Sequence, residues 1–260
     1  MGALYASSII LDRASYQQDT YWVRLHRFFV EQKILPSAGK EARVVVKDEK
    51  LLHQWRTVLR LKAGSEVILF DGFGSDHRCE LATLLRDQAV CLVREATPTS
   101  APPALELFLF ASLIKKDRFE WLLEKATELG VAQIRPVIAD RSEVRNFNLE
   151  RAKSIVREAA EQSGRGNLPA LYEPMALANV FSEYKFFTSI AFDPTGDLFK
   201  KDAWNKEKKL GAFIGPEGGW SARELEIFRG KKMSVASLGS ATLRAETAAA
   251  AVSALLLLSS

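Results

Sequence analysis

Cysteine and histidine are both scarce in this sequence, and each scarcity excludes classes of protein. Only two cysteines, Cys79 and Cys91, occur in 260 residues, and they form neither a CxxC pair nor a cluster with histidine. A disulfide framework and a structural zinc site are therefore not expected. The three histidines, His26, His53 and His77, show no metal-ligand spacing. We expect no bound metal.

A long apolar run is also missing. The longest uncharged stretch, Thr247 to Ser260, is shorter than the roughly 20 apolar residues of a membrane span, and it is typical of a buried terminal helix. Residues 1–20 include Asp12 and Asp19 and show no basic segment followed by an apolar block, so a secretion signal or transit peptide is not expected. We predict a cytoplasmic protein that does not contact a membrane.

Neither sign of charge dominates, and several common motifs are absent. The chain has 36 Lys plus Arg against 32 Asp plus Glu, a balance that neither requires nor excludes a nucleic-acid partner. The glycine-rich motifs G-x-G-x-x-G and G-x-x-x-x-G-K-[ST] do not occur, so a dinucleotide or nucleoside triphosphate is a poor candidate ligand. A nucleophilic triad has no support, because the G-x-S-x-G motif is missing and the second half has no histidine.

Two different patterns divide the chain. Short β-prone runs separated by turn residues fill Arg43 to Leu92 and predict a small β-barrel; they are Val44 to Val46, Val67 to Phe70 and Ala89 to Val93. A proline-rich stretch, T-P-T-S-A-P-P, follows and is typical of a stiff linker. We predict an N-terminal extension over 1–20, the barrel over 21–97, the linker over 98–103 and a second domain over 104–260.

The second domain alternates apolar strand-like runs with helical patterns, which predicts an α/β fold with a largely parallel sheet. The expected strands are Leu105 to Leu109, Val131 to Ile138, Phe186 to Phe192 and Leu210 to Ile214. A helix is expected after Lys116 and ends at Gly130, with one apolar stripe made by Phe119, Leu122, Leu123, Ala126 and Leu129. Another helix is expected from Leu149 to Ser163.

The loop I-G-P-E-G-G-W-S, Ile214 to Ser221, lies between a buried-looking strand and a helix. Ser221 and Glu224 have the capping-box spacing, so the helix start is well defined. The glycines allow backbone to approach a ligand closely, and Pro216 stiffens the entry to the loop. A small-molecule pocket and a plain strand-to-helix turn explain this loop equally well when it is taken alone.

A second loop, L-G-S-A-T-L-R-A-E-T from Leu238 to Thr247, precedes the last helix. It contains Gly239, the cation Arg244 and the carboxylate Glu246. Taken alone, this loop favours an ordinary explanation, in which Arg244 and Glu246 pair on a helix surface and contribute little.

Several separated motifs, in their order and spacing, together resemble the ribosomal RNA small subunit methyltransferase E family of the SPOUT superfamily, whose members methylate N3 of a uridine in 16S-type RNA. The motifs are R-F-F-V (27–30), V-L-R (58–60), L-F-D-G (69–72), K-K-D-R-F-E-W-L-L-E-K-A-T-E-L-G-V (115–131), E-A-A-E-Q-S-G-R (158–165), I-G-P-E-G-G-W-S (214–221) and L-R-A-E-T (243–247).

The resemblance implies a PUA-like β-barrel followed by a SPOUT α/β domain, whose C-terminal chain threads through a loop to make a deep trefoil knot. It further implies a homodimer that binds S-adenosylmethionine between the two loops and acts on 16S ribosomal RNA, within the small ribosomal subunit. One cofactor wall is then Gly215, Pro216, Glu217 and Gly218, and the other is Leu238, Gly239, Leu243 and Arg244.

The chemistry calls for a general base or for an electrophilic group that favours the anion, because uracil N3 must lose a proton before it attacks a methyl group. Glu217 is our candidate for the general base, and Arg244 for the group that stabilises the anion. For RNA, we expect the cations Arg27, Arg60, Lys62 and Arg165 to make contacts that fix register without reading sequence, with a solvated basic surface as an equal alternative for the barrel residues.

Three other functions stay open at this point. The same fold could methylate transfer RNA or another ribosomal position, or it could bind RNA without catalysis. A nucleotide-dependent enzyme ranks last because its phosphate-binding motifs are missing. The enzyme interpretation requires Gly218 and Gly239 to lie in one pocket.

Overall fold

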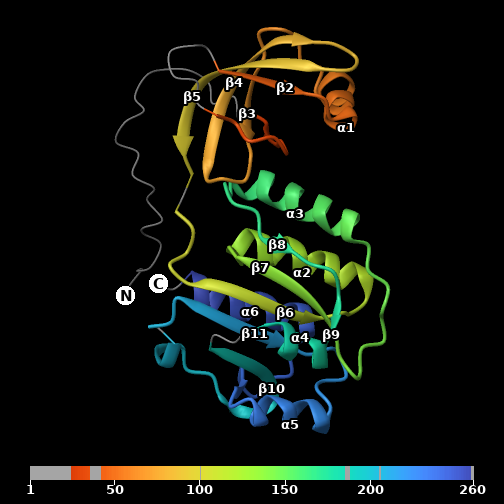
Figure 1. The fold of residues 1–260 in the computed structure, drawn as a ribbon, viewed down its shortest axis with the longest axis vertical. Helices are drawn as coiled ribbons and strands as arrows, with labels where there is room; N and C mark the ends of the chain where they lie inside the picture. The colour runs from red at the N-terminus through yellow and green to blue at the C-terminus, as the bar shows by residue number, and fades with distance from the viewer. Residues whose placement is uncertain (1–24, 36–41, 100, 185–187, 205, 259–260) are drawn as a thin grey trace, which may run out of the picture.

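The computed structural model describes residues 25–35, 42–99, 101–184, 188–204 and 206–258, and it has two parts, each built on its own sheet (Figure 1). The predicted N-terminal extension, residues 1–20, lies outside the described residues. No helix in the described part of the chain has the length and apolar character needed to cross a membrane. Within the same residues, no group of three or more His, Cys, Asp or Glu side chains could hold a metal ion.

The N-terminal part is a curled five-stranded sheet with the order β1-β3-β4-β5-β2. Its strands are β1 (Arg27–Phe29), β2 (Arg43–Val46), β3 (Glu66–Phe70), β4 (Ser75–Leu84) and β5 (Ala89–Pro98). The short helix α1 (Glu49–His53) and the π-helix η1 (Gln54–Val58) follow β2. Phe28 and Trp55 pack in the core of this part, with ring centroids 5.2 Å apart. The three predicted strand runs are confirmed.

The C-terminal part contains a seven-stranded sheet with the order β12-β10-β11-β6-β7-β8, and β9 also pairs with β7. Its strands are β6 (Glu106–Ser112), β7 (Gln133–Ile138), β8 (Ala170–Leu171), β9 (Met175–Ala176), β10 (Ser189–Leu198), β11 (Lys209–Ile214) and β12 (Ser234–Ser237). All the described pairings in this sheet are parallel, which confirms the α/β prediction.

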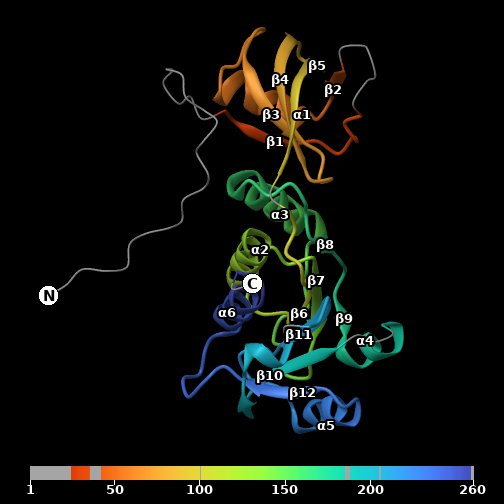
Figure 2. The ribbon, with the colours of Figure 1, turned by 90° about the vertical axis from the view of Figure 1, so that its left-hand side faces the viewer.

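Helices cover both faces of this sheet (Figure 2). One face carries α2 (Lys116–Leu129), α3 (Leu149–Ser163) and α6 (Ala245–Leu257), and the other carries α4 (Leu177–Glu183) and α5 (Ala222–Gly230); the 3₁₀ turn η2 (Lys201–Trp204) lies between β10 and β11. Alternate residues of β6 show why both faces are buried, since Leu107 and Leu109 join the α2 side and Phe108 joins the α5 side.

The two helices predicted most clearly begin and end where their sequences indicate. Helix α2 ends at Gly130, which adopts the left-handed conformation with φ of 97°. Helix α3 begins after Asn148, whose side chain accepts a hydrogen bond from the backbone N–H of Arg151 at 2.9 Å, and ends at Gly164.

Candidate functional site

The two glycine-containing loops line one cavity of about 420 Å³. Gly218 and Gly239 both face it, as the enzyme interpretation requires. All eight residues predicted as cofactor walls are among its lining residues: Gly215, Pro216, Glu217, Gly218, Leu238, Gly239, Leu243 and Arg244. The residues that the family resemblance assigns to the two walls therefore lie around a single cavity.

Strand order explains why loops so distant in sequence meet. Strands β11 and β12 both pair in parallel with β10, one on each side, so their carboxyl ends lie at the same edge of the sheet. The first loop follows β11 and the second follows β12. This edge, outside the carboxyl ends of parallel strands, is the usual position for ligands in open α/β sheets.

Local interactions hold the first loop in place. Ser221 and Glu224 form the predicted capping box at the start of α5. Gly215 lies against the Trp220 ring, where an added Cβ would come within 3.2 Å, so a larger residue would displace the indole. The Trp220 indole N–H donates to the carbonyl of Phe192 at 3.1 Å, which ties this loop to β10.

A third segment, which the sequence reasoning missed, completes the cavity. Phe192, Asp193 and Pro194 line it from the middle of β10, where the pairing with β12 shifts register. The buried Asp193 carboxylate accepts hydrogen bonds from the backbone N–H of Thr195 at 2.9 Å and from its hydroxyl at 2.6 Å. The sequence Asp-Pro-Thr-Gly after a predicted strand was the available signal, because these are turn-forming residues.

Ionisable side chains lie beside the cavity in an arrangement that the sequence did not predict. Arg118 of α2 donates to Oε1 of Glu217 at 3.2 Å, and its Nε lies 3.8 Å from Oε1 of Glu246. The predicted base Glu217 is therefore held by a cation from another element. Glu246 is 8% exposed, and its Oε2 is buried without a hydrogen-bond partner in the described structure.

Arg244 lies immediately before α6 as its N-terminal cap residue and is exposed. It does not pair with Glu246, so the helix-surface pair considered from the sequence is absent from the described residues. Its guanidinium makes no hydrogen bond or ion pair with the described part of the chain. Arg244 is thus a charged group at the cavity with its donors available to a ligand.

Comparison with known proteins identifies the family. A family model described as an RNA methyltransferase domain matches residues 101–257. The ribosomal RNA small subunit methyltransferase E of Synechocystis is 32% identical over 205 residues, which cover 76% of this chain and 67% of the relative. The chain belongs to the methyltransferase E family.

Further relatives agree over most of the chain. The ribosomal RNA small subunit methyltransferase E of Bacillus subtilis is 28% identical over 239 residues and is covered to 93%. A crystal structure of the Neisseria gonorrhoeae protein of the same name, bound to S-adenosyl methionine, superposes with a TM-score of 0.79 at 27% identity and covers 88% of this chain and 95% of that one.

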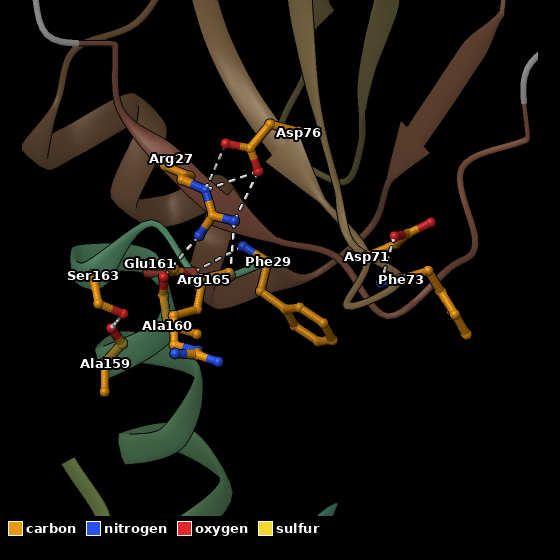
Figure 3. A network of polar contacts seen from close by, with 10 residues as sticks. All are labelled: Arg27, Phe29, Asp71, Phe73, Asp76, Ala159, Ala160, Glu161, Ser163 and Arg165. Carbon is orange, nitrogen blue, oxygen red and sulfur yellow. Dashed lines mark hydrogen bonds and ion pairs between the residues drawn. The ribbon is translucent and has the colours of Figure 1, made fainter. Parts of the chain in front are cut away.

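Arg27, which was predicted to contact RNA, instead binds groups within the protein (Figure 3). Its guanidinium forms an ion pair with Asp76 at 2.7 Å and donates to the carbonyls of Ala160 at 2.7 Å and Arg165 at 2.8 Å. The side chain is only 8% exposed. Arg27 is therefore engaged in joining the N-terminal sheet to the end of α3, where a cation is favourable.

Arg165 and Glu161 complete this contact between the two parts. The backbone N–H of Phe29 donates to Oε1 of Glu161 at 2.9 Å, and burial raises the pKa of the Glu161 carboxyl. The Arg165 guanidinium lies against Gly130, where an added Cβ would come within 2.4 Å, and burial lowers the pKa of Arg165. The motifs R-F-F-V and E-A-A-E-Q-S-G-R thus meet at one interface.

Arg60 and Lys62, the other cations predicted to contact RNA, are exposed on the N-terminal part. Arg60 has a positive φ of 54°, in the left-handed region that is uncommon for a non-glycine residue. The backbone of Lys62 exchanges hydrogen bonds with Ser65, its N–H donating to the hydroxyl at 2.9 Å and its carbonyl accepting from the backbone N–H of Ser65. Both charges lie in a short turn before β3.

Proposed function

We propose that this protein is an S-adenosylmethionine-dependent methyltransferase that methylates N3 of a uridine in 16S ribosomal RNA, within the small ribosomal subunit and in the cytoplasm. One observation carries the proposal: the two loops that follow β11 and β12 line a single cavity at the carboxyl edge of the parallel sheet. Membership of the methyltransferase E family supports it, as does a family member with bound S-adenosyl methionine.

The residues of this cavity fit such a cofactor. Its walls include apolar side chains, such as Leu238 and Leu243, and glycines, whose lack of a side chain lets a ligand approach the backbone. The apolar side chains would hold the adenine ring of the cofactor, and backbone polar groups would orient it, as in other small-molecule pockets. When bound, the cofactor supplies an electrophilic methyl group on a positively charged sulfur.

The chain's own residues must orient the acceptor base and remove its N3 proton. Arg244 is available to stabilise negative charge on a uracil oxygen, as the sequence predicts. Glu217 and Glu246, both near Arg118, are the two carboxylates that we consider as acceptors of the proton. Orientation of the reacting groups contributes most of the remaining acceleration.

The N-terminal part has the role of holding RNA in this proposal. We assign it to a PUA-like barrel over residues 21–97, joined by the linker 98–103 to the SPOUT domain over 104–260. The exposed Arg60 and Lys62 are its candidates for phosphate contacts. N3 lies on the pairing edge of uracil, so the target base must be unpaired or extruded before it reaches the cavity.

A trefoil knot in the C-terminal chain also belongs to the proposal. Strand β12 lies at the outer edge of the sheet, beyond β10, yet the helix α6 that follows it packs with α2 and β6 near the sheet centre. The segment 238–244 must therefore cross back over neighbouring strands, which is the path that a threaded chain requires.

We include a homodimer in the proposal. Helix α6 exposes Leu255 at 44%, and Leu258 directly after it is 65% exposed. Apolar residues exposed next to one another mark an interface more often than isolated ones do. A symmetric dimer would bury the same face on both copies.

The function is tested by methylation of isolated small ribosomal subunits with labelled S-adenosylmethionine, followed by mass-spectrometric mapping of the product. We expect one methylated uridine, modified at N3. Methylation of transfer RNA or of another ribosomal position would contradict the proposed substrate but not the proposed methyl transfer. Cofactor binding without methyl transfer to any RNA would contradict the proposal and favour an RNA-binding protein.

A further inference from the structure

A second hollow lies beside the cofactor cavity. It has a volume of about 340 Å³ and is lined by Asp117, Arg118, Trp121, Arg244, Glu246 and Thr247. Arg244 lines both cavities, and Arg118 in the hollow reaches Glu217 in the cofactor wall. The two cavities therefore adjoin, and a group bound in the hollow lies next to the cofactor wall.

Glu246 in this hollow lacks the hydrogen bonds that a buried carboxylate normally has. It is 8% exposed, its Oε2 is buried without a partner, and its Oε1 lies 3.8 Å from Arg118, beyond hydrogen-bonding distance. Most buried polar side-chain atoms in proteins are hydrogen-bonded, and an exception calls for an explanation such as a catalytic role. A ligand with an N–H donor would satisfy this carboxylate.

Trp121 supplies an aromatic surface in the same hollow. It lies on α2, one turn after Arg118, and is 40% exposed. Unpaired bases bind proteins by stacking on aromatic side chains, and their pairing edge is then recognised by hydrogen bonds. Trp121 and Glu246 offer these two features in one hollow.

We propose that the hollow between α2 and the start of α6 binds the extruded uracil, with Trp121 stacking on the ring and Glu246 accepting the N3 proton. The proposal rests on the proposed function and moves the proton acceptor from Glu217 to Glu246. The charged groups that face Glu246 are Arg118 and Asp117 from α2 and Arg244 from the preceding loop.

The step balances with groups already named. The N3 proton passes to the Glu246 carboxylate, and N3 gains the methyl group that the bound cofactor supplies. Arg244, at the boundary of the two cavities, is placed to stabilise the negative charge that develops on a uracil oxygen. Arg118 holds Glu217 and approaches Glu246, so it is a positioning residue for both carboxylates.

The test is single-turnover methylation of small ribosomal subunits by Glu246→Gln, measured across pH with the full-length protein. We expect a rate at neutral pH about 10²- to 10⁴-fold below wild type, as for loss of a general base. The residual rate should rise with pH, because N3 must then ionise unaided. Calorimetric affinity for S-adenosylmethionine should stay unchanged, and Glu226→Gln, on the exposed face of α5, is the matched control.

Two further variants keep the result interpretable. Glu217→Gln should retain the wild-type pH dependence, whatever its effect on cofactor affinity. Trp121→Ala should raise the KM for RNA roughly 5- to 150-fold, the loss expected for one base-aromatic stack, and Trp121→Phe should restore most of it.

The failure of this inference differs from the failure of the proposed function. A wild-type protein that methylates no RNA would overturn the function. An active wild type with Glu246→Gln within about threefold of it, or with the pH dependence altered by Glu217→Gln instead, would overturn only the assignment of Glu246. If Glu246→Gln does not fold, Glu246→Asp replaces it and should show a reduced rate with intact cofactor binding.

Discussion

The contact between the two parts and the edge of the parallel sheet use charged side chains in opposite ways. At the contact, every nitrogen of the Arg27 guanidinium donates a hydrogen bond to an acceptor within the protein. At the sheet edge, Arg244 is exposed without a described partner, and Glu246 is buried without a described hydrogen bond. Arg27 lies in the motif R-F-F-V, and Arg244 and Glu246 lie in L-R-A-E-T; both motifs carry the resemblance to the family.

This difference separates structural charges from functional ones. A buried charged group whose hydrogen bonds are all made within the protein has no free donor or acceptor for a ligand. A buried charged group without hydrogen bonds lowers the stability of the protein unless a ligand supplies them.

Arg27→Ala should produce the largest loss of stability. It leaves Asp76 and the carbonyls of Ala160 and Arg165 without their donor, and removal of one partner from a buried ion pair costs about 3 kcal/mol or more. Urea unfolding measures the change. Lys209→Ala is the control, because its ion pair with Glu106 is exposed and should contribute about 1 kcal/mol or less. Equal losses in both variants would contradict a structural role for Arg27.

Gly196→Ala should destabilise the cavity by a smaller amount. An added Cβ would come within 2.6 Å of the backbone of Val235 and Ala236, which cannot move aside as a side chain can. Overpacking of this kind costs about 1–3 kcal/mol, and displacement of the segment at Phe192 should also weaken cofactor binding. Gly230→Ala, where nothing lies within 4 Å, is the matched control. Thermal unfolding would measure the loss of stability, and calorimetry would measure cofactor binding. An unchanged cofactor affinity would show that this segment does not contribute to the cofactor site.

Glu161→Gln should have the smallest effect on the free energy of unfolding, and that effect should change with pH. Burial raises the pKa of Glu161 above the ordinary 4.5, so the folded state binds this proton more tightly than the unfolded state does. The wild type therefore loses stability as pH rises from that value through the folded pKa. The glutamine side chain keeps an acceptor for the Phe29 N–H and cannot ionise. The stability of the variant should therefore rise relative to that of the wild type as the pH increases from 4 to 7. A difference in unfolding free energy between the variant and the wild type that stays constant across that range would contradict the raised pKa of Glu161.

Sequence patterns predicted the features that depend on neighbouring residues. Periodicity and residues such as Ser221 and Gly130 predicted helices α2 and α3, the capping box at Ser221 and the parallel strands. The meeting of the two glycine-containing loops followed from the family resemblance, and the strand order supplies its physical reason.

Features that depend on distant contacts were not predictable. Arg27 meets residues 133 and 138 positions away, and no local pattern distinguishes such an arginine from one that contacts RNA. The contact between Arg118 and Glu217 spans 99 positions for the same reason. Asp193 could have been found from its turn sequence, although only the register shift in β10 directs that turn toward the cavity.

The most direct test of the central claim is calorimetric titration of S-adenosylmethionine into the wild type and into Ala241→Trp. Ala241 lines the cavity and is exposed, so the larger ring should occupy cofactor space without unfolding the protein. Ala96→Trp, on the exposed face of β5 in the N-terminal part, is the control. We predict binding by the wild type and by Ala96→Trp, with at least tenfold weaker binding by Ala241→Trp. Wild-type affinity in Ala241→Trp would contradict the placement of the cofactor between the two loops.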